Sequence, residues 1–250
     1  MVDQMVQAET NAWRTRQFFL YRSQERSSRT GGHLWEELVV ETSDGPLRLL
    51  ISEDGRQLSS IRQREEKNRI TYLASHPNEF RRSNRRRQED EARLPALLRE
   101  LPSIFLFKTT RSAGGYTQIA FQPNPSFHER SYQDRIVHAM SGVLIVHATD
   151  MRLSELDVHL EHRVEFGFGL LGEIRERTHF SLTREEAFPG QWVAADVGIY
   201  LDGSVLLVKS LSREVNSRHF AFKRVPHDLT VAQAAAILLS NSVEQSTGSK

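Results

Sequence analysis

The chain has 250 residues, and its 33 Lys and Arg nearly balance its 32 Asp and Glu, which excludes a global attraction to nucleic acid or anionic membranes. Hydrophobic residues make up 38% and charged residues 26%, proportions typical of a folded domain that can bury a core. The absence of cysteine excludes disulfides, thiolate catalysis and cysteine metal sites.

Neither a membrane span nor an export signal is visible in the sequence. No stretch reaches the roughly 20 apolar residues that a spanning helix needs. Met1–Ala12 lacks the apolar core of a signal peptide. We therefore expect a cytoplasmic protein, or a periplasmic one whose signal was removed or lies upstream of Met1.

Three antiparallel strands are expected in the first third of the chain. Trp13–Arg26 contains a strand-like apolar run, and apolar residues alternate with charged ones over Leu34–Glu41 and Leu47–Ile51. Turn-forming residues follow the second and third strands, at Ser43–Pro46 and Asp54–Gly55.

A charged helical insertion is expected at about 59–101. Its segments 59–73 and 77–101 are rich in Arg, Glu and Gln with scattered apolar residues, and Ser59 or Ser60 can cap the first helix. Pro95 is expected to break a helix or to begin one.

The insertion carries a basic cluster at Arg81–Arg87. Arg85 and Arg86 stand four residues before Glu89 and Asp90, a spacing that favours ion pairs along one helix. A solvated helix face is therefore the favoured interpretation, with anionic lipid, a partner protein or nucleic acid as alternatives.

Strands are expected again after the insertion. The runs 104–110 and 116–122 flank the turn Gly114–Gly115, a short helix is predicted at 132–140, and the strand 142–148 is apolar on both faces. The last hundred residues predict long antiparallel strands, a hairpin turn at Asp202–Gly203 and a helix at about 228–241. The predicted strands there are 153–168, 174–183, 191–201, 205–211 and 215–224.

Leu156–Leu170 is the most regular segment, because every second residue is apolar except His162. Alternation of this kind predicts one strand, or two joined by a bend, with one wet and one buried face. We expect the buried face to form a concave ligand-binding wall, in which His162 is either a hydrogen-bonded core residue or a polar group facing the ligand. The predicted ligand-binding residues are Leu156, Val158, Leu160, His162, Val164, Phe166, Phe180 and Leu182.

The other motifs do not indicate a nucleotide-binding, metal-binding or catalytic site. Gly167–Gly172 matches the GxGxxG dinucleotide fingerprint, but a predicted strand follows it where that fingerprint requires a helix. Asp157, His159 and Glu161 lie on the predicted polar face and are interpreted as exposed residues rather than metal ligands. A G-x-S-x-G nucleophile motif is absent. The sequence predicts no catalytic residue, no metal and no cofactor.

Several segments resemble a family of uncharacterised bacterial secreted proteins that are similar to the LolA and LolB lipoprotein carriers. The resemblance lies in 48–55, 140–146, 151–153, 166–172 and 222–233. It implies a single LolA-like domain over 1–250 of mainly β, α+β class: a half-open antiparallel barrel of about ten long strands wrapped around the inserted and C-terminal helices. It also implies a periplasmic location and a cavity for acyl chains.

The favoured function is therefore binding or carriage of a lipid or lipoprotein in the bacterial envelope, and the partners expected are an acyl chain or an envelope protein. The first alternative is a small enzyme that uses a polar residue such as His162 inside the cavity. The second is a ligand-free structural protein in which Arg85–Arg87 form an interaction surface.

Overall fold

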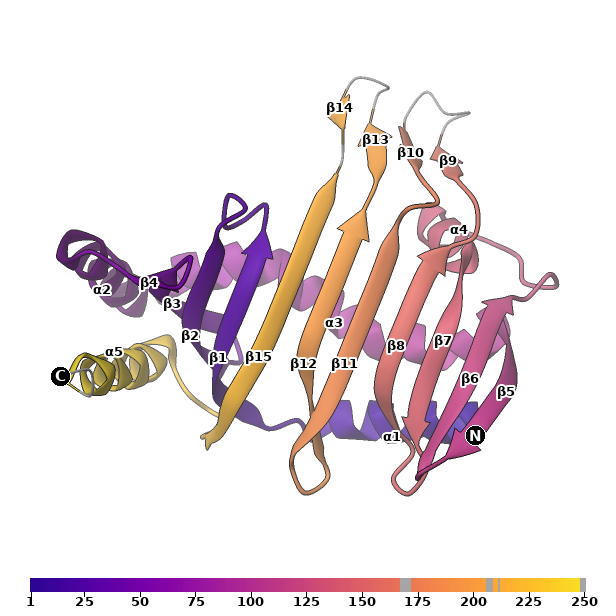
Figure 1. Ribbon diagram of the computed structural model, residues 1–250, viewed down its shortest axis with the longest axis horizontal. Helices are drawn as coiled ribbons and strands as arrows, with labels where there is room; N and C mark the ends of the chain where they lie inside the picture. Colours follow the sequence, from indigo (N-terminus) through magenta and orange to yellow (C-terminus); the bar gives the residue numbers. More distant parts are fainter. Residues whose placement is uncertain (167–171, 206–208, 211, 248–250) are drawn as a thin grey trace. The chain divides into compact units, whose positions relative to one another are not determined.

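The computed structural model describes residues 1–166, 172–205, 209–210 and 212–247, and every strand pair whose register it gives is antiparallel (Figure 1). The contacts group the chain into two compact units. The first unit comprises residues 1–15 and 95–216, and the second comprises 16–94 and 217–250. Each unit combines an antiparallel sheet with helices, so the predicted α+β class is confirmed.

The first unit contains a sheet in the order β12-β11-β8-β7-β6-β5, together with helices α1 and α4. A second, four-stranded sheet has the order β14-β13-β10-β9. The bounds are α1 Val2–Arg14, β5 Phe105–Ala113, β6 Tyr116–Pro123, α4 Tyr132–His138, β7 Met140–His147, β8 Arg152–Leu160, β9 Val164–Phe166, β10 Gly172–Ile174, β11 His179–Phe188, β12 Gln191–Leu201, β13 Gly203–Val205 and β14 Lys209–Ser210.

The second unit contains strands in the order β4-β3-β2-β1-β15 and two helices. Its bounds are β1 Phe18–Ser27, β2 Leu34–Thr42, β3 Gly45–Glu53, β4 Arg56–Gln57, α2 Ser60–Ser75 and α5 Val231–Thr247. Two elements contribute residues to both units, α3 Pro77–Ile104 and β15 Arg213–Val225. The strand order of each unit has two ends, so the described strands do not close into a barrel.

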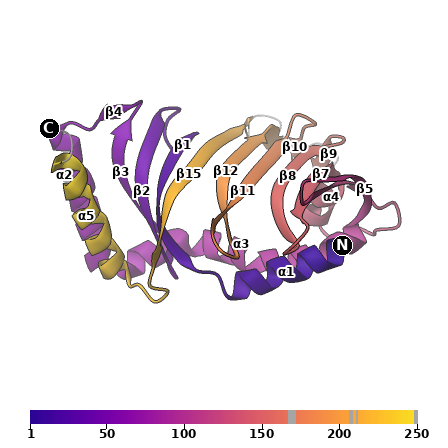
Figure 2. The ribbon, with the colours of Figure 1, turned by 60° about the horizontal axis from the view of Figure 1, so that its bottom comes forward.

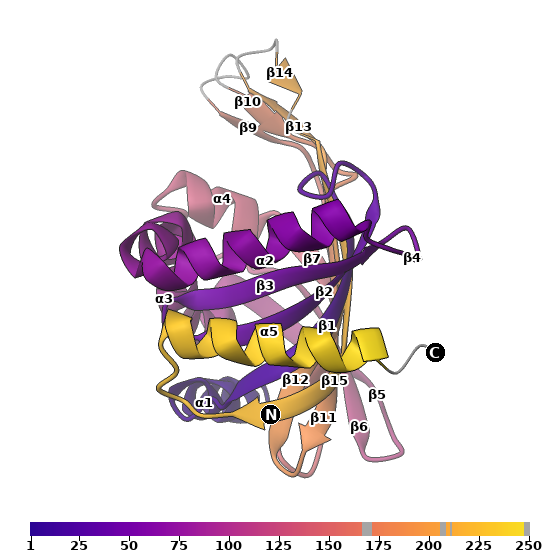
Figure 3. The same ribbon diagram turned by 90° about the vertical axis from the view of Figure 1, so that its left-hand side faces the viewer.

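The core of the second unit lies between its strands and two helices. Helices α2 and α5 run side by side across β2 and β3 (Figure 3). Leu38 and Val40 of β2 share one face by alternation, and both pack in a cluster with Ile70 of α2 and Leu238 of α5. Burying each side chain of this size contributes about 1.5–3 kcal/mol.

The core of the first unit is the apolar layer that helix α1 covers. Helix α1 packs on strand β8 (Figure 2), and its Met5 and Val6 are buried against Leu144 and Val158. Glu9 fixes the helix, because its carboxylate accepts hydrogen bonds from Arg152 Nε at 3.0 Å and Arg184 Nη1 at 2.8 Å. Helix α1 is not among the elements expected from the sequence.

The predicted helical insertion is confirmed as α2 and α3, and the cap of α2 is Ser59, whose side chain accepts from the Arg62 N–H. Pro95 lies inside α3 rather than at a helix end. Its own carbonyl accepts a hydrogen bond from Arg99 Nε at 2.9 Å. The predicted pair of Arg85 and Glu89 is also present, at 2.9 Å.

Of the two arrangements predicted for Leu156–Leu170, one continuous strand is wrong, because the described part forms two strands, β8 and β9, with a bend at residues 161–162 between them. Strand β8 ends at Leu160, and β9 pairs with β10 in the four-stranded sheet instead. The intervening Arg163 N–H donates to Glu176, outside any strand ladder. Residues 167–171, which carry most of the GxGxxG match, lie outside the described residues.

The predicted hairpin turn at Asp202–Gly203 is also wrong. Asp202 is buried, and the chain continues from β12 into β13. The Asp202 carboxylate accepts hydrogen bonds from Arg175 Nη1 and Arg177 Nε, both at 3.0 Å. The Asp of an Asp-Gly pair can therefore form a buried ionic contact, and the pair does not always mark a turn.

The C-terminal helix is confirmed with shifted bounds, since α5 starts at Val231 rather than 228. Thr230 caps it, because its Oγ1 accepts from the Gln233 N–H at 3.2 Å. No helix in the described part of the chain is long and apolar enough to cross a membrane.

Candidate functional site: a charged cavity in the second unit

A cavity of about 390 Å³ lies in the second unit between strands β2 and β3 and helices α2 and α3. This volume falls in the range of about 300–1,000 Å³ that is typical of small-molecule sites. Its lining includes a charged wall, formed by Arg29, Glu37 and Arg48, and the apolar residues Leu47, Leu73 and Phe80.

Strand alternation builds the charged wall. Glu37 on β2 lies opposite Ser23 on β1, and Arg48 on β3 lies opposite Val39 on β2. The odd-numbered residues of β1 and β2 therefore share a face with Arg48, while Leu38 and Leu49 point to the opposite, apolar face. Burial of this face is thus compatible with charged side chains only if they pair with one another.

Glu37 is the centre of the ionic pairing. Its side chain is 3% exposed, and its carboxylate accepts from Arg29 Nη1 at 2.9 Å, Arg29 Nη2 at 2.7 Å and Arg48 Nη1 at 2.9 Å. Arg29 also binds Glu25, with Nη2 at 2.7 Å from Oε2. A buried carboxylate is costly to desolvate, and two guanidinium groups with direct hydrogen bonds offset that cost.

The environment keeps these groups charged. Burial acts to raise the pKa of Glu25. Hydrogen bonds from Arg29 and Ser27 lower the pKa by more than burial raises it, so the net pKa lies below its ordinary value. Burial lowers the pKa of Arg48, yet Tyr21 and Glu37 raise it and the net pKa is raised. The pKa of Arg29 is likewise raised, because the hydrogen bonds with Glu37 and Glu25 outweigh its burial.

Helix α2 completes the cavity and also caps the edge of strand β3. Glu66 Oε2 accepts from the Leu50 N–H at 3.3 Å, and Arg69 Nη2 donates to the Arg48 carbonyl at 2.6 Å. Arg69 and Glu66 are themselves paired at 2.7 Å. These side chains form hydrogen bonds with main-chain groups that an edge strand otherwise presents to solvent.

Glu37 and Arg48 differ in how many hydrogen bonds they form. Glu37 accepts three hydrogen bonds from arginines, whereas Arg48 donates through Nη1 alone among the described residues. Trp35 lines the cavity, and its Nε1 atom is buried without a hydrogen-bond partner. Buried donors are seldom left unpaired in folded proteins, and burial keeps this N–H group out of reach of water and of a ligand in the cavity.

The predicted ligand-binding residues lie in the first unit, and none of them lines this cavity. Val158, Leu160 and Val164 are buried, and Leu156, Phe166, Phe180 and Leu182 are half-buried. They do not form one group. Leu156, Val158 and Phe180 pack in the cluster that contains Met5 of α1, whereas Leu160, Val164 and Phe166 pack with Ala139.

His162 does not lie on the buried face where the sequence analysis placed it. It is exposed in the segment between β8 and β9, because the strand ends at Leu160 and the alternation no longer determines the direction of side chains beyond that point.

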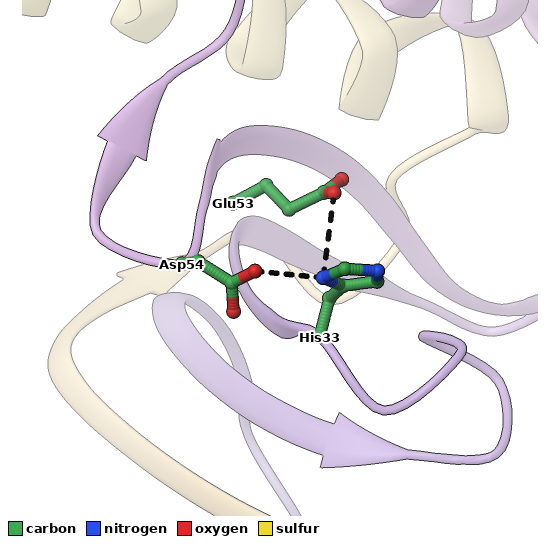
Figure 4. A group of neighbouring side chains, drawn as sticks. All are labelled: His33, Glu53 and Asp54. Carbon is green, nitrogen blue, oxygen red and sulfur yellow. Dashed lines mark hydrogen bonds and ion pairs between the residues drawn. The ribbon is translucent and has the colours of Figure 1, made fainter.

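Two further polar groups contain the residue types found in metal and catalytic sites. His33 Nδ1 lies 2.7 Å from Asp54 Oδ2 and 3.8 Å from Glu53 Oε1 (Figure 4). Ligand atoms on one tetrahedral zinc ion lie about 3.3 Å apart, so the contact with Asp54 is a hydrogen bond rather than a vacant metal site. That hydrogen bond raises the pKa of His33 and lowers the pKa of Asp54.

The second group is Ser141, His159 and Glu161. Ser141 Oγ lies 3.0 Å from His159 Nε2 and donates to Glu161. Glu161 is 3.8 Å from the same nitrogen, His159 Nε2. A catalytic triad instead places the acid on the other ring nitrogen, where it orients the base. This group is therefore a hydrogen-bonded surface cluster.

The residues of the charged cavity are not among the site residues expected from the sequence. The available signal was an arginine inside the apolar run Leu47–Ile51, together with Glu37 in a strand, but either is compatible with an exposed position. Comparisons with protein-family models, curated proteins and solved structures gave no match to this chain.

Proposed function

We propose that the chain is a binding protein of carrier type whose ligand is an amphiphile of the lipid class. The observation that carries the proposal is the cavity of about 390 Å³, whose lining includes charged residues such as Arg48 and apolar residues such as Leu73 and Phe80. A ligand with an apolar chain and a polar end group matches a lining of both kinds.

The resemblance of the sequence segments to the LolA and LolB carriers supports the same function. With it we propose a half-open barrel, a periplasmic location and an envelope protein as a partner. The open order of the antiparallel strands supports the barrel proposal. The enzyme alternative receives no support from His162, since that side chain is exposed.

Binding of a fluorescent fatty acid tests the proposal directly. We expect saturable uptake by the wild-type protein and added mass of lipid size in native mass spectrometry of gently purified protein. Leu73→Trp should reduce uptake, because the larger ring fills the cavity that Leu73 lines. Leu97→Trp is the matched control, since Leu97 is 36% exposed on α3 and does not line the cavity.

Absence of uptake together with a clean unliganded mass contradicts the proposal. A second informative result is loss of uptake in Phe180→Trp with normal uptake in Leu73→Trp. That outcome retains the lipid ligand but assigns it to the apolar layer of the first unit.

A further inference from the structure

We propose that the polar face of strands β8 and β11 binds a divalent transition-metal ion through His159, His179 and Asp157. All three residues belong to the first unit and none lines the cavity of the second unit, so the site goes beyond the proposed function. The ion is of the zinc or nickel type, because imidazole suits these ions whereas calcium and magnesium take oxygen ligands.

Strand register brings the two histidines together. His159 of β8 stands directly opposite His179 of β11, and the two strands are neighbours in the sheet (Figure 1). The Leu160 N–H donates to the Thr178 carbonyl at 3.2 Å, so the adjacent pair, His159 and His179, is one without mutual main-chain hydrogen bonds. Side chains lie closest in pairs of this kind, with Cβ atoms about 4.5–5.5 Å apart. Two imidazoles at this separation can reach one ion.

Asp157 supplies a carboxylate beside the histidine pair. It lies two residues before His159 on β8, so both side chains share a face of the sheet. Its Oδ2 lies 3.0 Å from His179 Nε2, a hydrogen bond in this structure. A tetrahedral zinc ion holds its ligand atoms about 3.3 Å apart, so an ion that replaces the shared proton separates these two side chains only slightly. Two imidazoles and one carboxylate form a ligand set found in zinc sites, where water takes the remaining position.

The three side chains are accessible to an ion from solvent. His159 and His179 are 52% and 43% exposed, and Asp157 is 62% exposed. His159 Nε2 lies 3.0 Å from Ser141 Oγ on β7, so the His159 ring has to turn toward β11 to coordinate. The turn costs one surface hydrogen bond, which water replaces, and Ser141 keeps Glu161 as its acceptor.

A second imidazole distinguishes this site from the group around His33. That group offers one imidazole and two carboxylates, Glu53 and Asp54. Nitrogen ligands favour zinc and nickel over calcium and magnesium, so a pair of imidazoles binds these ions more selectively than one does. The sequence places Asp157 and His159 on one strand face, but His179 joins them only through the pairing of β8 with β11.

Calorimetric titration of the full chain with zinc chloride tests the proposal. We expect saturable binding of zinc by the wild type and no comparable binding of calcium chloride. His159→Gln and His179→Gln should each lower the zinc affinity about tenfold or more, because each removes one of three protein ligands. Asp157→Asn should lower it by less, since the amide oxygen of Asn remains a weak ligand.

His162→Gln and His33→Gln are the matched controls. His162 is exposed in the segment that follows β8, and His33 belongs to the second unit. Both variants should bind zinc as the wild type does, and circular dichroism establishes that every variant is folded. NMR of the imidazole nitrogens gives a second measurement: zinc should shift the signals of His159 and His179 together and leave that of His162 unchanged.

Loss of zinc affinity in both His159→Gln and His179→Gln, with normal affinity in the controls, supports the site. Equal zinc affinity in the wild type and in a folded His179→Gln variant overturns it, and so does loss of affinity in His33→Gln. Calcium binding as tight as zinc binding overturns the role of the imidazoles. Uptake of a fatty acid is measured separately, so failure of the metal site leaves the proposed function intact.

Discussion

Glu37 shows how one buried carboxylate organises the charged wall. Its side chain is 3% exposed and bonds to two arginines, Arg29 and Arg48, from different segments of the second unit. Removing one partner of such a group leaves the opposite charges uncompensated, which costs more than the intact pairing contributes to stability. The residue therefore determines where both guanidinium groups point.

Glu37→Gln is expected to lower the free energy of unfolding by about 3 kcal/mol, because the arginines keep their charge and lose their counterion. Urea unfolding followed by circular dichroism measures the change. Glu65→Gln is the control: Glu65 is 60% exposed on α2 and pairs with Arg62 at 3.5 Å. It should change stability by less than about 1 kcal/mol. Equal effects of the two substitutions contradict the central role of Glu37.

Glu25 makes stability depend on acid pH. Its pKa is lower in the folded state than its ordinary value, so its contribution is present above the ordinary pKa and is lost as pH falls through the folded pKa. We expect the free energy of unfolding to decrease less steeply in Glu25→Gln than in the wild type between about pH 4.5 and pH 2. Urea midpoints measured across this range test the expectation, and parallel curves refute it.

At the scale of the element, α2 protects the edge of β3. Glu66 and Arg69 bond to the N–H of Leu50 and the carbonyl of Arg48, and the two-residue strand β4 pairs with Ser52 and Glu53 farther along. The helix thereby shields main-chain groups that a second extended chain could otherwise pair with.

Glu66→Ala should accelerate hydrogen exchange at the Leu50 amide, because that N–H loses its acceptor. The cost of an unpaired buried donor also predicts a loss of about 1–3 kcal/mol in the free energy of unfolding. Amide exchange followed by NMR resolves this site, and Glu65→Ala on the same helix provides the comparison. Unchanged exchange at Leu50 in Glu66→Ala shows that other contacts protect the edge.

Strands β8 and β9 show why an alternating pattern does not determine the length of a strand. Leu160 and Val164 are both buried and are separated by an even number of positions, as a continuous strand requires. Yet β8 pairs with β7 and β11, whereas β9 pairs with β10. Both arrangements bury the same apolar residues, so the pattern alone does not distinguish them.

At the scale of the whole molecule, the chain divides into two units with separate cores. Ligand binding stabilises the part of a protein that it contacts, by about 2.7 kcal/mol at a concentration 100 times the dissociation constant. A saturating concentration of a fatty acid such as dodecanoate should therefore slow amide exchange in β2 and β3, around Val39 and Leu50, more than at Ile119 of β6. Protection centred on Leu156 and Phe180 places the ligand in the first unit and contradicts the cavity assignment.

The sequence by itself determined the class of the elements in most of the chain. The charged helices at about 59–101, the C-terminal helix and the strand-rich remainder follow from periodicity and from capping residues such as Ser59 and Thr230, which act within a few neighbouring positions. The ion pair between Arg85 and Glu89 is local in the same way and was predicted for the same reason.

Only the tertiary structure decided which charged residues are buried together. Arg29, Glu37, Arg48 and Glu66 are far apart in the sequence, and each is individually typical of a solvated surface. Strand register and the position of α2 bring them to one wall, where mutual pairing makes their burial possible. The same non-local contacts direct the chain out of β8 after Leu160 and leave His162 exposed, since side-chain direction follows the strand pairing that the fold selects.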